Sequence, residues 1–143
     1  MSGIITVGFV QATKNYFSKW LDFSSRSPRS EYWWGTLGAT LIALLGSIPI
    51  GVVVGFVSIG MDVNAETVAN FVMIPIQIFF LIAGIALGVR RLHDLNKSGW
   101  WMLLYLTIVG GLVVIYWCCV KGEERGNRFG LDPLVAPNTP AET

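Results

Sequence analysis

The chain has 143 residues, of which 53% are hydrophobic and only 13% are charged, and its formal net charge is +1. This length excludes a multidomain protein, and the charged share is about half of that in a typical soluble domain. The net charge indicates little as a total, because the charges of a membrane protein matter by their positions.

Three long stretches carry no charge at all: residues 32–61, 67–89 and 99–120. Apolar runs of about 18 or more residues are typical of transmembrane helices. We therefore predict an all-α integral membrane protein with membrane-inserted segments over residues 32–59, 68–89 and 100–120. Residues 1–31 are expected to form a cytoplasmic amphipathic N-terminal segment, and residues 121–143 a polar, largely flexible tail.

The first predicted element is an amphipathic helix over residues 6–21. At 100° per residue its apolar half contains Phe9, Val10, Ala12, Tyr16, Phe17, Trp20 and Leu21. Lysines and amides occupy the other half. This division favours a helix that lies in the membrane interface. The competing interpretation is a helix that packs on the protein's own cytoplasmic loops.

The charges that flank the first two spans predict their orientation. Arg26 and Arg29 precede the first span, whereas the loop between the spans contains Asp62 and Glu66 and no base. Because cations are enriched in cytoplasmic loops, we expect the N-terminus inside and the acidic loop outside.

Small residues predict where helices approach closely. Gly84 and Gly88 of the second span lie at the depth of Gly35 and Ala39 of the first span, which predicts a close contact there. The Gly51-x-x-x-Gly55 spacing near the outer end of the first span is a candidate face for a homo-oligomer.

The third apolar run, residues 100–120, has two interpretations. Its length suffices for a single crossing, but a crossing would place the cations of the tail outside. A re-entrant hairpin broken at Gly110 and Gly111 would return those cations to the inside, although the backbone at its tip needs cover. Hydropathy and length favour a single crossing, and the charge distribution favours the hairpin. By a small margin we predict three crossings in all.

Three motifs in this chain together resemble a known family. We define the first motif as residues 26–34, the second as residues 90–101 and the third as residues 126–133. Their order and spacing are similar to those of small bacterial inner-membrane proteins grouped as "domain of unknown function 805". The chain departs from the usual pattern at Ser25, Pro28 and Leu131. The resemblance implies a multi-pass protein of the bacterial cytoplasmic membrane and no established activity.

The sequence gives only weak evidence for a catalytic or metal-binding site. His93 and Asp94 resemble an acid–base pair, and with Glu31 a metal site, but one histidine does not supply a usual zinc set. The favoured interpretation is that these side chains stabilise the loop. Cys118 and Cys119 are adjacent, which disfavours a disulfide between them. We expect no enzyme activity, catalytic residue, cofactor, metal or nucleic-acid partner.

Cations and tryptophans at the predicted cytoplasmic surface indicate binding of anionic lipid headgroups or of an acidic protein. We define the candidate face as Arg26, Arg29, Glu31, Trp33, Trp34, Arg90, Arg91, His93, Asp94, Lys97, Trp100, Trp101, Asn127 and Arg128. We expect a non-enzymatic membrane component that acts through this face. The alternative is a subunit of an oligomeric small-solute transporter or channel.

Overall fold

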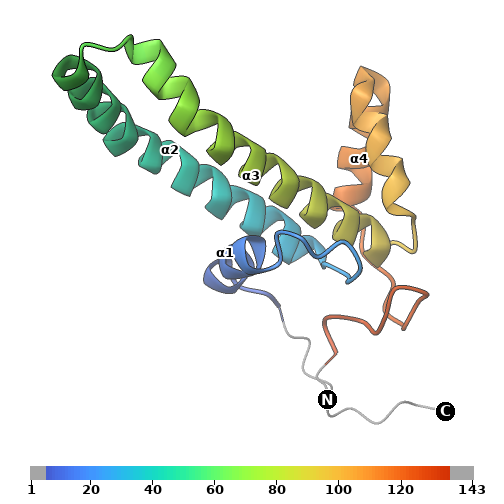
Figure 1. Cartoon of the computed structure of the whole chain (residues 1–143). Coiled ribbons are helices and arrows are strands. Elements are labelled where there is room, and N and C mark those ends of the chain that lie inside the picture. The colour runs from blue at the N-terminus through green and yellow to red at the C-terminus, as the bar shows by residue number, and fades with distance from the viewer. Residues whose placement is uncertain (1–5, 136–143) are drawn as a thin grey trace.

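The computed structural model describes residues 6–135, and every regular element in them is helical. In chain order these are α1 (Phe9–Ser18), α2 (Arg29–Met61), α3 (Ala65–Asp94), the 3₁₀ helix η1 (Gly99–Leu106) and α4 (Ile108–Cys119). The long helices α2 and α3 are antiparallel neighbours. We call the end at which α2 begins and α3 finishes the motif end, and α1, η1 and α4 all gather there (Figure 1). The outermost parts of the expected N-terminal segment and tail, residues 1–5 and 136–143, lie outside the described residues.

Helices α2 and α3 have the length and surface of membrane spans. Their 33 and 30 residues correspond to roughly 50 and 45 Å, more than the ~30 Å of a hydrocarbon core. The most apolar window of each has a mean hydropathy of 2.4, yet only 11% and 22% of those windows are buried. A core helix of a soluble protein would be mostly buried. The apolar side chains of this pair instead face outward, as they do where lipid is the solvent.

The turn between the two helices is short and polar. Asp62 adopts a left-handed backbone (φ 50°) that ends α2. The Asn64 side chain then accepts a hydrogen bond from the Glu66 N–H and caps the start of α3. Such caps satisfy backbone groups that the helix itself leaves free.

Helix α1 packs across α2 and α3 rather than against a loop. Ala12 and Tyr16 of its apolar face are buried, and the Tyr16 hydroxyl donates to the Phe80 carbonyl of α3 at 2.9 Å. Tyr16, Ala39, Ala83 and Leu87 form a buried hydrophobic cluster. The aromatic rings packed around this cluster belong to Phe17, Trp20, Tyr32 and Phe80. The predicted amphipathic helix exists, and part of its apolar face is covered by the protein itself.

The small residues of the two spans make room for more than one neighbour. A Cβ at Gly38 would collide with the Thr13 side chain, and one at Gly35 would lie 3.3 Å from the Ala12 carbonyl oxygen, so these glycines admit α1. The predicted approach of the two spans is also seen here, since a Cβ at Gly35 would lie 3.5 Å from Leu87 of α3 and Ala39 shares a buried cluster with Leu87. On α3, Gly84 faces the Tyr16 hydroxyl and Gly88 faces Met102 of η1.

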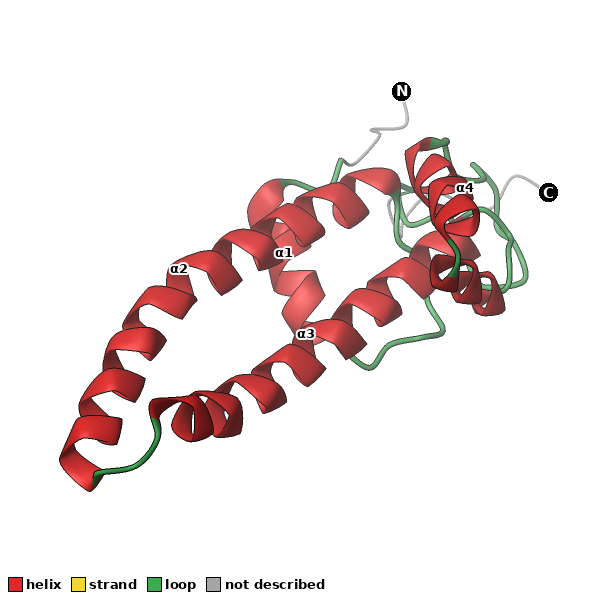
Figure 2. Cartoon of the chain, turned by 90° about the horizontal axis from the view of Figure 1, so that it is seen from above, coloured by secondary structure: helices red, strands yellow, loops and turns green. Residues whose placement is uncertain are grey.

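Away from the motif end, α2 and α3 diverge (Figure 2). A Cβ at Gly51 or Gly55 would meet no atom within 4 Å, so both glycines face open space. The homo-oligomer face at this spacing remains a prediction.

The third apolar run is not one helix. η1 and α4 are separated by Thr107, whose extended backbone (φ −120°, ψ 146°) interrupts the helical hydrogen bonds. The Thr107 hydroxyl donates to the Leu104 carbonyl and accepts from the Gly110 N–H, each at 3.1 Å. Eight residues of 3₁₀ helix and twelve of α-helix correspond to roughly 16 and 18 Å, each shorter than a hydrocarbon core.

The two pieces fold back on each other as a hairpin (Figure 1). The rings of Trp101 and Trp117 meet edge to face with centroids 5.7 Å apart. Both ends of the hairpin lie at the motif end, since the Glu123 N–H donates to the Asp94 carbonyl at 2.9 Å. The expectation of a continuous segment over residues 100–120 is therefore not met, and the break falls before the predicted glycine pair because the Thr107 side chain caps α4.

Candidate functional site

Asp94, at the end of α3, is the centre of a buried ionic network. Its Oδ1 accepts hydrogen bonds from Arg26 Nε at 3.1 Å and Nη2 at 3.0 Å, and its Oδ2 accepts one from Arg91 Nη1 at 2.6 Å. The side chains of Arg26, Arg91 and Asp94 are 1%, 0% and 5% exposed. Charges removed from water this completely are stable only when they are paired and hydrogen-bonded. The first and second motifs thus meet at this carboxylate.

A second buried pair links the start of α2 to the end of α3. Arg90 Nη1 lies 3.4 Å from Glu31 Oε1, and the side chains are 0% and 4% exposed. Arg90 Nε also donates to the Ala86 carbonyl at 3.4 Å. Among the described residues, Arg90 Nη2 and the Ser27 hydroxyl are buried without a partner. Pro28, which has no side chain that could accept a hydrogen bond, occupies the cap position of α2.

The chain after α4 is bound to this network. We call residues 121–135 the C-terminal strap. Arg26 donates to three of its carbonyls, at 2.6 Å to Glu123, 2.8 Å to Arg125 and 3.2 Å to Gly130. Asn127 and Gly130 form an isolated β-bridge. The strap is therefore held to the network, because a buried guanidinium finds its remaining acceptors there. The flexibility expected of residues 121–143 as a whole stays a prediction.

Arg91 fixes the returning leg of the hairpin. Its Nη2 donates to the Val120 carbonyl and lies 3.4 Å from the Trp117 carbonyl. These are carbonyls at the end of α4, which the helix leaves free and which carry partial negative charge. One arginine thus joins α3, Asp94 and α4.

His93 is a packing group. Its ring stacks on Phe129 of the strap with centroids 3.7 Å apart and 6° between the planes. Its Nδ1 lies 3.3 Å from the Ser25 carbonyl oxygen, and its backbone carbonyl accepts from Asn127 Nδ2 at 2.9 Å. The third motif is therefore bound to the second through this residue. Residues 6–135 contain no group of three His, Cys, Asp or Glu side chains able to hold a metal ion.

The remaining members of the candidate face are exposed or half-buried. Trp33 and Trp34 are each 45% exposed, and Trp100 is 79% exposed. Lys97 lies over the Trp117 ring at 4.5 Å. Arg128 lies over Phe129 at 4.7 Å and donates to the Asn96 carbonyl. The candidate face consequently divides into a buried part that holds the fold together and an outer part available to other molecules. The outer members are Arg29, Trp33, Trp34, Lys97, Trp100, Trp101 and Arg128.

Gly122 is a residue of this site that sequence reasoning missed. A Cβ at this position would overlap the Asp94 carboxylate. No pattern in the sequence marks Gly122, because the carboxylate that approaches it comes from a helix 28 positions earlier in the chain.

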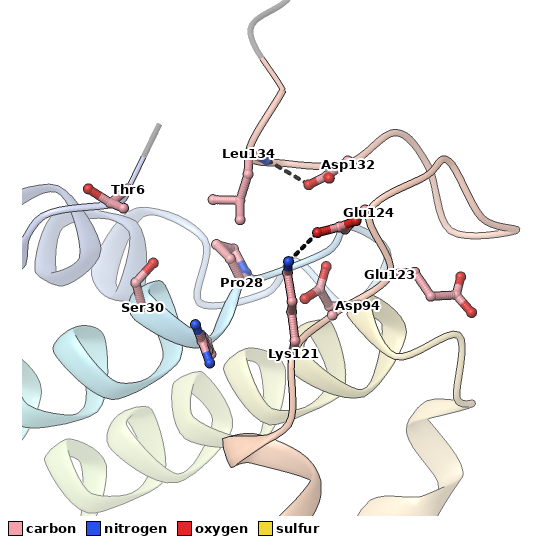
Figure 3. Close-up of a pocket in the computed structure, with 11 residues that line it drawn as sticks. Thr6, Pro28, Ser30, Asp94, Lys121, Glu123, Glu124, Asp132 and Leu134 are labelled. Atoms are coloured by element: carbon pink, nitrogen blue, oxygen red, sulfur yellow. Dashed lines mark hydrogen bonds and ion pairs between the residues drawn. The ribbon is translucent and has the colours of Figure 1, made fainter. Parts of the chain in front are cut away.

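A cavity of about 210 Å³ adjoins the network (Figure 3). Its lining includes Arg29 and Ser30 from the start of α2 and Lys121, Glu124 and Asp132 from the strap. Lys121 and Glu124 form an exposed ion pair. The hydrogen bond and the charge of Lys121 lower the pKa of the Glu124 carboxyl.

Comparison with known proteins follows the same motifs. The family model described as "Protein of unknown function (DUF805)" matches residues 20–131. Inner membrane protein YhaI of Escherichia coli (strain K12) is 31% identical over 131 residues, which cover 91% of this chain and 98% of YhaI. Inner membrane protein YhaH of the same strain is 29% identical over 133 residues, which cover 90% and 98%. No solved structure gives a significant match.

Proposed function

We propose that this chain, which belongs to the DUF805 family of inner membrane proteins, is a non-enzymatic membrane component that binds anionic lipid headgroups. The binding surface would be the outer part of the candidate face together with Arg125 of the strap. The proposal adds a molecular role to a family whose function is unknown.

The observation that carries this proposal is the division of the motif cations. Arg26, Arg90 and Arg91 are at most 5% exposed, and their guanidinium groups bind carboxylates and carbonyls of the protein itself. Arg125 and Arg128 are exposed, and Lys97 is half-buried. Exposed cations beside exposed tryptophans suit the interface of an anionic leaflet, where each cation adds about 1 kcal/mol of attraction.

The hairpin supports a topology with only two crossings. With both of its ends at the motif end, all ten lysines and arginines would lie on the cytoplasmic side, as the positive-inside bias favours. Leu106 and Ile108 at the hairpin tip are 84% and 89% exposed, which suits insertion of the tip into lipid. In this proposal the third segment is re-entrant, and both termini are cytoplasmic.

The same geometry argues against acid–base catalysis by the second motif. The Asp94 carboxylate has both oxygens bound by arginines, and the His93 ring is stacked on Phe129. A general acid or base needs a free position within reach of substrate. We therefore assign these residues to the fold.

The test measures binding of short-chain phosphatidylglycerol to the purified protein in detergent. Replacing Lys97, Arg125 and Arg128 with glutamine should weaken binding by on the order of a hundredfold at low salt, and should flatten the salt dependence. Glu123→Gln is the matched control, because it removes an exposed negative charge from the same strap and should strengthen binding.

Unchanged phosphatidylglycerol binding by the triple variant would remove the proposal. Solute flux through reconstituted protein that persists in that variant would then favour the oligomeric transporter or channel.

A further inference from the structure

The cavity beside the ionic network has two chemically different sides. Figure 3 shows Thr6 and Ser30 on one side, and Glu124 and Asp132 on the other. Arg29 adjoins Ser30 in the first turn of α2 and also lines the cavity. A hydroxyl and guanidinium side therefore faces a carboxylate side.

Several of the charges that line the cavity are already used by the fold. Asp94 is held by Arg26 and Arg91, and Lys121 is paired with Glu124. Of the ion pairs among residues 6–135, none involves Arg29. Within residues 6–135, the Asp132 carboxylate accepts a single hydrogen bond, from the Leu134 N–H of its own turn to Oδ1 at 2.8 Å. A cation and a carboxylate thus remain available on opposite sides.

This arrangement selects the charge of a ligand. A simple anion would pair with Arg29 but would meet the carboxylates of Glu124 and Asp132. A simple cation would pair with Asp132 but would meet Arg29 and Lys121. A small molecule that carries both charges, a few bonds apart, places its anion at Arg29 and its cation at Asp132, and no ion pair among residues 6–135 uses either of these two groups.

The volume and the position of the cavity further restrict which ligands fit it. The volume of about 210 Å³ is below the roughly 300–1,000 Å³ of cavities that hold drug-sized molecules. Exposed Trp33 and Trp34 follow Arg29 by about one helical turn, roughly 6 Å. Because such tryptophans lie at headgroup level, the cavity is within reach of a lipid headgroup.

We propose that this cavity binds a phosphoethanolamine group, with Arg29 and Ser30 at the phosphate and Asp132 at the ammonium. The ligand is the headgroup of a membrane lipid or a soluble phosphoethanolamine ester. The site shares Arg29 with the anionic-lipid surface proposed above and differs from that surface by Asp132, which the ammonium requires.

The experiment uses full-length protein, delipidated in detergent, and measures binding of short-chain phosphatidylethanolamine, phosphatidylcholine and phosphatidylglycerol. Phosphatidylethanolamine should bind about tenfold more tightly than phosphatidylcholine, because methylation removes the three N–H donors of the ammonium. Arg29→Gln should weaken binding of both zwitterionic lipids by about tenfold, and Asp132→Asn should weaken that of phosphatidylethanolamine more than that of phosphatidylcholine, which has only its charge and no N–H donor to lose. Lys14→Gln, which removes an exposed cation of α1 outside the cavity, should leave phosphatidylethanolamine binding unchanged.

Competition with water-soluble phosphoethanolamine identifies the source of the ligand. Displacement at similar concentrations supports the site with a soluble ligand, and failure to displace supports the site with a lipid. Equal binding of the three lipids, or preference for phosphatidylglycerol that Arg29→Gln abolishes, would overturn the proposal. The surface proposal is judged separately, by the response of phosphatidylglycerol binding to the triple variant.

Discussion

At the scale of single residues, the arginines of the motifs are distinguished by what accepts their hydrogen bonds. Arg26 and Arg91 share one carboxylate, and further donors of both go to backbone carbonyls of the strap and of the end of α4. Such donors would be costly if they were left unpaired. The ionic network therefore helps to fix the strap and the end of α4 in position.

We predict that Asp94→Asn is the most damaging single change in this network. It leaves Arg26 and Arg91 buried without a counter-charge, a change that typically costs about 3 to 5 kcal/mol. Thermal unfolding of the purified protein in detergent measures the loss. Glu31→Gln should cost less, because its single partner Arg90 lies at the longer distance of 3.4 Å.

The matched control for Asp94→Asn is Glu124→Gln in the exposed pair with Lys121. The side chains of that pair are 65% and 71% exposed, and exposed pairs contribute little to stability. If Asp94→Asn unfolds at the same temperature as Glu124→Gln, the buried network does not stabilise the fold.

At the scale of elements, α1 packs closely on α2 because α2 has glycine, with no side chain, at the contact. Gly35 and Gly38 let the backbone of α1 approach closely, and the Tyr16 hydroxyl then reaches a carbonyl of α3. A helix with the same apolar face would otherwise lie free in the interface. Two effects hold α1 in place: packing of its buried residues against the protein, and partition of its remaining apolar surface into lipid. Phe9 and Val10, which are 40% and 64% exposed, belong to that remaining surface.

We predict that Gly38→Ala displaces α1. The added methyl group would collide with the Thr13 side chain, and overpacking of this kind costs about 1 to 3 kcal/mol. Lower thermal stability and faster chemical labelling of Lys14 would report the displacement. Gly46→Ala on the same helix meets no atom within 4 Å and should be neutral or stabilising, since alanine favours helix over glycine. Equal behaviour of the two variants would contradict this account of the contact.

At the scale of the whole molecule, the three motifs join the start of α2, the end of α3 and the strap into one unit at the motif end. Arg26 contacts both Asp94 and Gly130, so it joins the segments on either side of the hairpin. This connection supports the proposed topology with two crossings, which the following experiment tests.

We predict that a reporter fused after the last residue is cytoplasmic. A fluorescent protein that matures only inside should be bright, and a phosphatase that is active only outside should be inactive. The same pair of reporters fused after Val63 in the acidic turn is the control and should give the opposite pattern. An active phosphatase at the C-terminus would mean three crossings, and the contacts between Arg26 and the strap could not form.

The sequence was sufficient for features that depend on local composition. The all-helical class, the two long spans and the amphipathic helix appear close to the expected residues, because hydropathy and helical periodicity are properties of contiguous segments. The predicted spans of residues 32–59 and 68–89 end a few residues short of α2 and α3, since the helices continue past the apolar core into the ionic network. The three motifs also identified the family.

Tertiary structure alone decided which motif residues are buried, how α1 docks and where the hairpin turns. Arg26 and Asp94 are 68 positions apart, and Arg26 and Gly130 are 104 apart, so no local pattern shows that these cations are paired. Read along the chain, Arg26, Arg90 and Arg91 resemble the exposed Arg29 and Arg128. What separates them is desolvation, which a charge experiences only when distant segments close around it.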